Sequence, residues 1–417
     1  MRILIASPSL PWPLDQGSNS AQFSTLKCLA EDHQFTLVCP IFDERGVGDA
    51  RELQTQLPLV EIRAVPRWAN QPMLHPKANV MLRAARGCVR LGRRLINPPA
   101  PQPEMPYYPF NPLPESFLKV LDDELSKGVD LFQAELAQML SLGTWLPTRL
   151  PKLFIHHQIH FVYTRRFLDA RGRNGYLNYL EALMRFQEHA YLQNFDGLIV
   201  FSDHDRQTLL PLMQPERLFV SPFPIPADVG VACDSDATFD NRFVLVASEY
   251  FPNRDGLEWL LAEIWPEIRR KLPSSSLDVV GRCNETAKAQ LAAPGVSFTG
   301  FVPDLAAALR GGIMLVPLRI GSGIRTKILA SMAQGVPVVS TSIGCEGLLV
   351  TDGTDILVRD EPLQFAAAAV SLAQDPNLRL RLASAGKDSV SKHYSPQEVR
   401  RRRNEIYEAV LENARSK

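Results

Sequence analysis

Short runs of apolar and β-branched residues recur along the whole chain, and stretches with helical periodicity separate them. In the first half we predict strands at Arg2–Ser7, Phe35–Pro40, Val60–Val65, Leu131–Leu136, Leu153–His157, Leu198–Ser202 and Leu218–Ser221. In the second half we predict strands at Phe243–Ser248, Leu277–Gly281, Val296–Thr299, Ile313–Pro317, Val336–Ser340 and Asp355–Val358. Runs that are apolar on both faces and alternate with helices indicate an α/β protein with parallel sheets covered on both sides.

The two series of strands are separated by Ser221–Asp240, a segment rich in proline, aspartate and serine. Such a segment is typical of a hinge between domains. We therefore predict two tandem, doubly wound Rossmann-like domains that face a cleft. The N-terminal domain is expected at residues 1–222 and the C-terminal domain at residues 223–395.

Composition and charge narrow the possible functions. The chain has 417 residues, and its 45 basic and 45 acidic residues give a net charge of zero. A protein that coats nucleic acid normally carries a positive excess, so we expect no nucleic-acid partner. The six cysteines form no Cys-x-x-Cys pair, which argues against a zinc ribbon or a redox motif. No apolar run is long enough to span a membrane, and the N-terminal stretch fits a strand better than a signal peptide, so we expect a cytoplasmic protein.

A glycine loop in the second half has the character of a phosphate site. Gly321, Ser322 and Gly323 follow a predicted strand and precede a predicted helix at residues 324–334. The first turn of a helix offers unpaired N–H groups and a positive dipole end, which suit an anion. Arg325 and Lys327 lie at this helix start, where cations oppose the dipole unless an anion is bound. The alternative is an ordinary turn with solvated cations, but the strand–loop–helix context favours a phosphate site.

Residues 315–348, LVPLRIGSGIRTKILASMAQGVPVVSTSIGCEGL, resemble the C-terminal half of GT-B glycosyltransferases of the retaining family 4, also called glycosyl transferases group 1. The opening MRILIASPSLPWPLDQGS is similar to the first strand and glycine loop of that family, and YFPNRDGLEWLLAEIWPEI is similar to the start of its C-terminal domain. The resemblance extends over nearly the whole chain. It implies a GT-B fold in which a last helix, at residues 396–417, packs back on the N-terminal domain.

The resemblance also implies an activity, the transfer of a sugar from a nucleotide diphosphate donor with retention of configuration and without a metal. Arg325 and Lys327 match the positions at which relatives carry the cations that neutralise the leaving diphosphate, so the resemblance implies this role for them. Arg254 is either a third cation or a solvated loop residue. The remaining donor-binding residues that the resemblance implies are Gly17 and Ser18 in the first glycine loop, Gly300, Phe301 and Val302 at the nucleobase turn, and Gly321, Ser322 and Gly323.

One departure from the family pattern concerns the ribose. Relatives have two acidic residues eight apart around the glycine-loop helix, and the second usually binds the ribose; here the matching positions are Ser322 and Ala330. A lost hydrogen bond to a charged group costs about 1.5–3 kcal/mol, which corresponds to roughly ten- to a hundredfold in donor affinity. Glu346 is a candidate to compensate, and its alternative role is a carboxylate at a helix start.

Three histidines, His156, His157 and His160, cluster at the end of a predicted strand. Relatives commonly have a histidine here that faces the reacting sugar, and His157 fits that register best. We expect it to bind the transferred sugar rather than to act as a nucleophile. Arg165 and Arg166 follow, and they resemble an arginine of relatives as much as they fit a solvated helix face.

The N-terminal domain, which we expect to bind the acceptor, contains a local excess of positive charge. Between Arg63 and Pro103 there are eight basic residues and no acidic one. A basic amphipathic helix suits an anionic membrane surface or a diphosphate-linked lipid acceptor, whereas a solvated, paired face is the simpler interpretation. The arginines that share one helical face are Arg83, Arg86, Arg90, Arg93 and Arg94.

Three functions remain open at this stage. The first is a glycosyltransferase that acts on a glycan, a lipid-linked saccharide or a small molecule. The second is a degenerate GT-B homologue that binds a nucleotide or a partner protein without transferring sugar, which the alanine at position 330 motivates. The third is a sugar-nucleotide epimerase of the same fold, which the GSGIRTKIL segment fits less well.

Overall fold

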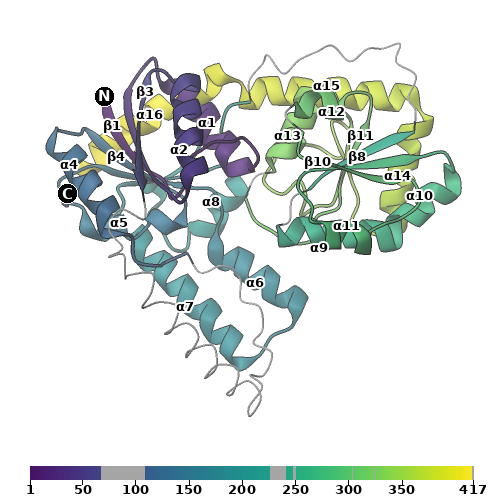
Figure 1. Ribbon diagram of the computed structural model, residues 1–417, viewed down its shortest axis with the longest axis horizontal. Helices are drawn as coiled ribbons and strands as arrows, with labels where there is room; N and C mark the ends of the chain where they lie inside the picture. Colours follow the sequence, from purple (N-terminus) through teal and green to yellow (C-terminus); the bar gives the residue numbers. More distant parts are fainter. Residues whose placement is uncertain (67–108, 226–240, 248–249, 303, 324, 416–417) are drawn as a thin grey trace, which may run out of the picture.

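The computed structural model describes residues 1–66, 109–225, 241–247, 250–302, 304–323 and 325–415. It contains two parallel sheets, one of seven and one of six strands, each flanked by helices on both sides (Figure 1). The predicted fold class, two doubly wound α/β domains, is therefore confirmed. The basic segment with Arg83, Arg86, Arg90, Arg93 and Arg94, and most of the predicted hinge, lie outside the described residues.

The N-terminal sheet has the strand order β3-β2-β1-β4-β5-β6-β7. Its strands are β1 (Arg2–Ala6), β2 (Gln34–Ile41), β3 (Val60–Pro66), β4 (Leu131–Glu135), β5 (Lys152–His156), β6 (Gly197–Val200) and β7 (Leu218–Val220). Its helices are α1 (Gly17–Leu29), α2 (Glu44–Gln56), α4 (Glu115–Ser126), η2 (Ala137–Met139), α5 (Leu142–Trp145), α6 (His160–Arg171), α7 (Gly175–Leu192), α8 (Asp203–Leu209) and η3 (Pro215–Arg217). The order reverses between β1 and β4, where ligands bind in sheets of this kind.

The C-terminal sheet has the same topology, in the order β10-β9-β8-β11-β12-β13. Its strands are β8 (Arg242–Val246), β9 (Ser276–Val280), β10 (Val296–Gly300), β11 (Ile313–Val316), β12 (Val338–Ser340) and β13 (Leu357–Val358). Its helices are α9 (Phe251–Trp259), the π-helical turn η5 (Leu260–Ile264), α10 (Trp265–Lys271), α11 (Glu285–Gln290), α12 (Leu305–Leu309), α13 (Thr326–Ala333), α14 (Pro362–Gln374) and α15 (Pro376–Tyr394).

Every predicted strand is present, because the central strands are buried on both faces as their sequence pattern requires. All side chains of β4, β5, β6 and β11 are buried. The strand ends differ from prediction by at most two residues, as at β12, which begins at Val338 rather than at Val336. Pro337 has no N–H to donate to a neighbouring strand, which explains the later start.

The last helix, α16 (Pro396–Arg415), returns from the second domain to the first, on which the N-terminus also lies (Figure 1). Tyr407 and Val410 on its inner face are fully buried. Val410 lies so close to Gly197 at the start of β6 that a Cβ there would stand 2.3 Å from its methyl group. Only glycine fits at this position, so the sheet is shaped to receive the helix.

Candidate functional site

The glycine loop between β11 and α13 has a backbone that only glycines adopt readily. Gly321 and Gly323 have φ angles of 135° and 79°, in the region that side chains disfavour. A Cβ on Gly323 would lie 2.4 Å from the carbonyl oxygen of His157 in the other domain. Ser322 adds a hydrogen bond of 3.2 Å from its hydroxyl to the Ile159 carbonyl. The loop is therefore packed directly against the carboxyl end of β5.

Arg325, the residue before the first turn of α13, curls back under this loop. Its Nη1 donates to the carbonyl oxygens of Ser322 and Gly323, at 2.6 and 2.9 Å. Its Nε and Nη2 are buried and have no hydrogen-bond partner. Burial lowers the pKa of Arg325, since a cation taken out of water lacks compensation. Two unused donors therefore remain at the helix start.

Lys327 lies on the adjoining turn and points toward the first strand of the same domain. Its Nζ donates to the Val246 carbonyl at 2.7 Å and to Asn253 Oδ1 at 2.8 Å. Burial, with a smaller repulsion from Arg325, lowers the pKa of Lys327 to about 7. Among the ion pairs of the described residues, none joins a carboxylate to Arg325 or Lys327. A loop with two such cations at a helix N-terminus has the charge and the N–H groups to hold an anion, and we call it the anion cradle.

His157 is held from the first domain at the edge of this cradle. Its Nε2 lies 2.6 Å from Glu135 Oε2, and both side chains are almost completely buried. Its ring also contacts the Phe201 ring edge to face, with centroids 5.0 Å apart. The two other histidines differ from it: His156 lies 3.0 Å from the buried carboxylate of Glu188, and burial lowers the pKa of His160 to about 4. His157 is thus the histidine that meets the glycine loop.

Arg166, on α6, bridges the two domains at the same place. Its guanidinium forms two hydrogen bonds of 2.7 Å to the carboxylate of Glu346 and a third to the carbonyl oxygen of Gly321. His204 Nε2 lies 3.3 Å from the same carboxylate. Glu346 follows a turn rather than starting a helix, so the helix-start alternative is wrong. Its carboxylate is engaged by Arg166, which leaves less of it for a ribose.

The first glycine loop also reaches the cradle. Gly17 and Ser18 begin α1, and a Cβ on Gly17 would lie 2.7 Å from the Thr326 hydroxyl in the first turn of α13. The segment Gly300–Val302, which the resemblance assigns to the nucleobase, starts at the last residue of β10. Phe301 there is half exposed, with the Arg282 guanidinium 5.4 Å above its ring.

Arg254 is directed away from the cradle. Its guanidinium bonds to Glu258 on its own helix at 2.8 Å and to Gln290 on α11 at 3.3 Å. Its neighbour Asn253 supplies the contact to Lys327 instead. Ala330 lies on α13 one turn beyond Thr326 and offers no acceptor, as expected from the sequence.

Sequence reasoning did not select Glu135, Arg166 or Asn253 as site residues. The sequence does hold a signal for Arg166 as a site residue, since Arg165 and Arg166 resemble an arginine of relatives. Glu135 is the last residue of a fully buried strand, and a carboxylate at the carboxyl end of a buried strand is itself a signal for a site. Asn253 carried no signal of its own.

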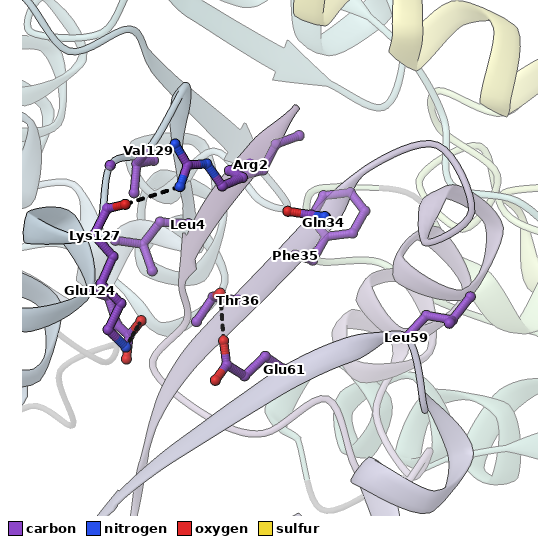
Figure 2. Close-up of a pocket in the computed structure, with 12 residues that line it drawn as sticks. Arg2, Leu4, Gln34, Phe35, Thr36, Leu59, Glu61, Glu124, Lys127 and Val129 are labelled. Atoms are coloured by element: carbon purple, nitrogen blue, oxygen red, sulfur yellow. Dashed lines mark hydrogen bonds and ion pairs between the residues drawn. The ribbon is translucent and has the colours of Figure 1, made fainter.

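A surface pocket of about 340 Å³ lies elsewhere (Figure 2). It is lined by the amino-terminal ends of β1 and β2, including Arg2 and Gln34, and by the end of α4 with Glu124 and Lys127. Hydrogen bonds from Arg2 to the Lys127 carbonyl and from Thr36 to Glu61 cross its walls. Because this is the opposite edge of the sheet from the cradle, it plays no part in the site.

Two facing Rossmann-like domains with an anion cradle at a glycine loop of the second are the GT-B architecture, and comparisons with known proteins agree. Residues 241–375 match the family model described as "Glycosyl transferases group 1". The match covers much of the C-terminal domain, so this part of the chain is similar to that glycosyltransferase group. The resemblance stated from the sequence is confirmed.

Solved structures support the fold over the whole chain. Anabaena HepE in complex with UDP and glucose is similar with a TM-score of 0.67 at 14% identity, covering 98% of this chain and 100% of HepE. A mutant of S. aureus TarM has a TM-score of 0.69 at 11% identity, covering 97% and 99%. Sucrose-phosphate synthase from Thermosynechococcus elongatus has a TM-score of 0.66 at 16% identity, covering 99% of both chains.

One curated relative is similar in sequence, a 44.6 kDa protein in the cps region of Klebsiella pneumoniae. It is 22% identical over 291 residues, which span 66% of this chain and 74% of the relative. Within the described parts of the chain, no helix is long and apolar enough to cross a membrane. The same parts contain no group of three or more histidine, cysteine, aspartate or glutamate side chains arranged to hold a metal ion.

Proposed function

We propose that this protein transfers a sugar from a nucleotide diphosphate donor to an acceptor hydroxyl with retention of anomeric configuration. The observation that carries the proposal is the anion cradle. Arg325 keeps two buried donors without partners, and Lys327 lies half-buried beside it with no carboxylate among its described contacts. Burying cations unpaired is costly, so the site is built for an anion that arrives with the ligand.

The cradle supplies the charge that the reaction needs. When the bond between the anomeric carbon and the β-phosphate oxygen breaks, negative charge develops on the diphosphate, and Arg325, Lys327 and the α13 N-terminus stabilise it. We propose that no metal takes part, because these groups occupy the place where a cation is required. The acceptor oxygen bonds to the anomeric carbon on the face that the phosphate leaves, and its proton passes to the leaving phosphate oxygen. His157 binds the transferred sugar.

The donor and the setting are proposed from relatives. HepE has been crystallised with UDP-glucose, so UDP-glucose is the first donor to test. The Klebsiella relative belongs to a cps region, which is in keeping with a role in polysaccharide biosynthesis at a cytoplasmic location. The acceptor is a glycan, a lipid-linked saccharide or a small molecule.

A degenerate homologue that binds a nucleotide or a partner protein without transferring sugar is the second candidate. Ala330 favours it, because the resemblance assigns ribose binding to a carboxylate at this position. The ion pair between Arg166 and Glu346 leaves less of the Glu346 carboxylate to take over that role.

Isothermal titration with UDP, GDP, ADP, dTDP and UDP-glucose tests the cradle. We expect one nucleotide to bind and the Arg325→Ala variant to lose that binding, whereas Arg254→Ala keeps it because its side chain points to Glu258 and Gln290. Release of sugar from the matching donor then separates a transferase from a degenerate homologue. If no nucleotide binds, the transferase proposal fails.

A further inference from the structure

We infer that Glu135 is a positioning residue that fixes the tautomer and orientation of His157, through a hydrogen-bonded chain that begins on the C-terminal helix. The inference rests on the proposed function only in assigning a sugar contact to His157. Glu135 lies at the end of β4 and His157 directly after β5, and these strands are neighbours in the sheet. The register of the sheet therefore places the two side chains together at its carboxyl edge.

The contact between them is short and shielded from water. Glu135 Oε2 lies 2.6 Å from His157 Nε2, and the two side chains are 5% and 7% exposed. An ionised carboxylate can only accept hydrogen bonds, so Nε2 carries a proton. In the neutral ring Nδ1 is then the acceptor, and it is the nitrogen left to receive a hydrogen bond from a sugar hydroxyl.

A chain of amide and hydroxyl groups holds the other oxygen of Glu135. Gln133 Nε2 donates to Glu135 Oε1 at 2.6 Å, and the Tyr407 hydroxyl donates to Gln133 Oε1 at 3.1 Å. Gln133 and Tyr407 are fully buried, and Tyr407 belongs to α16. The direction of each bond is thus set: the Tyr407 hydroxyl donates to the Gln133 amide oxygen, the Gln133 amide N–H donates to the Glu135 carboxylate, and the His157 Nε2–H donates to the same carboxylate from the other side.

The directions of these hydrogen bonds predict which tautomer His157 adopts in the Glu135→Gln variant. As long as Tyr407 donates to Gln133, the Gln133 amide must present its N–H groups to residue 135. The new glutamine must then turn its oxygen to Gln133 and its N–H groups to His157 Nε2. A donor facing Nε2 requires a lone pair there, so the ring proton moves to Nδ1 and the neutral histidine adopts the opposite tautomer.

Nitrogen-15 NMR of histidine-labelled full-length protein, at a pH where the ring is neutral, reads the tautomer directly, with His157→Gln to assign the signal. We expect the Nε2–H tautomer in the parent and in Tyr407→Phe, and the Nδ1–H tautomer in Glu135→Gln. The double variant Glu135→Gln/Tyr407→Phe should give a mixture, because Gln133 can then turn over. Glu181→Gln, a charge-matched change on α7 where Glu181 pairs with Arg165 and Arg173, should leave the signal unchanged.

Kinetics provide the second measurement. With UDP-glucose, or whichever donor the titrations select, Glu135→Gln should lower kcat for donor turnover about tenfold, the loss of one well-placed hydrogen bond, with nucleotide affinity unchanged. The double variant should recover part of that loss, which a general destabilisation would not do. A parent that binds no nucleotide would defeat the proposed function and leave the tautomer result standing. An unchanged tautomer in Glu135→Gln would overturn the inference, whatever the activity.

Discussion

Lys327 should make donor binding depend on pH in a direction that its surroundings fix. In the free protein, burial lowers its pKa to about 7. A bound diphosphate supplies the missing negative charge and returns the pKa toward the ordinary value for lysine, about 10.4. Between these two values the complex binds more protons than the free protein, so binding takes up a proton and the affinity falls as the pH rises.

The size of the effect follows from the two pKa values. The protonated fraction of a group with a pKa of about 7 falls from about 0.9 at pH 6 to about 0.01 at pH 9. The dissociation constant should therefore rise by up to about a hundredfold over this range, or about 2.7 kcal/mol. Lys327 keeps some exposure to solvent, so this is the upper end of the expected effect. At pH 8, binding should take up about 0.9 proton.

Isothermal titration in buffers of different ionisation enthalpy measures both quantities. The ligand should be an intact nucleotide sugar, because its diphosphate diester has no proton to exchange in this range, whereas a free nucleoside diphosphate does. Lys327→Arg keeps a charge at every pH and should bind with little pH dependence. Lys327→Met should bind weakly throughout. Equal affinity of the parent at pH 6 and pH 9 with no proton uptake, or an unchanged slope in Lys327→Met, would refute the argument.

Three further predictions concern other parts of the cleft. Arg166→Ala and Glu346→Ala should be coupled in a double-mutant cycle on donor affinity by about 1–3 kcal/mol, and additive effects would contradict a shared contact between the domains. Ala330→Glu should tighten the bound ribonucleotide roughly ten- to a hundredfold and leave its 2′,3′-dideoxy analogue unchanged, as titration of both would show. The membrane-surface interpretation of the basic segment predicts that reversing the charges of Arg86, Arg90 and Arg93 abolishes flotation of the protein with anionic vesicles, and equal flotation of parent and variant would exclude that interpretation.

The fold could be predicted from the sequence because its determinants are local. Each strand of the two sheets is a short apolar run. Burial on both faces gives β1 and β11 the same sequence pattern, in which consecutive residues are apolar. The glycine loop was equally accessible, since Gly321, Gly323 and the two cations stand within seven residues. In the helix after the loop, Ile328, Leu329 and Met332 recur at the spacing of one helix face, and all three are buried.

Residues that join the site from a distance were harder to find. Asn253 and Arg254 are adjacent, and the sequence favoured the arginine because a cation suits a diphosphate. Successive residues of a helix point about 100° apart, however, so only one of the two can face Lys327. On α9 that residue is Asn253, while Arg254 reaches Glu258 one turn along the same helix. Which of the two faces inward depends on the rotation of the helix, and that is set by packing between elements rather than by the local pattern.

The contacts between the domains converge on the cradle itself, and this bears on how a donor reaches it. Gly323 touches the backbone of His157, Gly17 touches Thr326, and Arg166 binds the carbonyl of Gly321 together with Glu346. No side chain, even a methyl group, fits between Gly323 and His157, so a sugar ring does not fit there either. A donor whose sugar lies between these two residues would need the domains farther apart than they are here. Under the proposed function, binding of its diphosphate to Arg325 and Lys327 would then be coupled to the separation of the two domains.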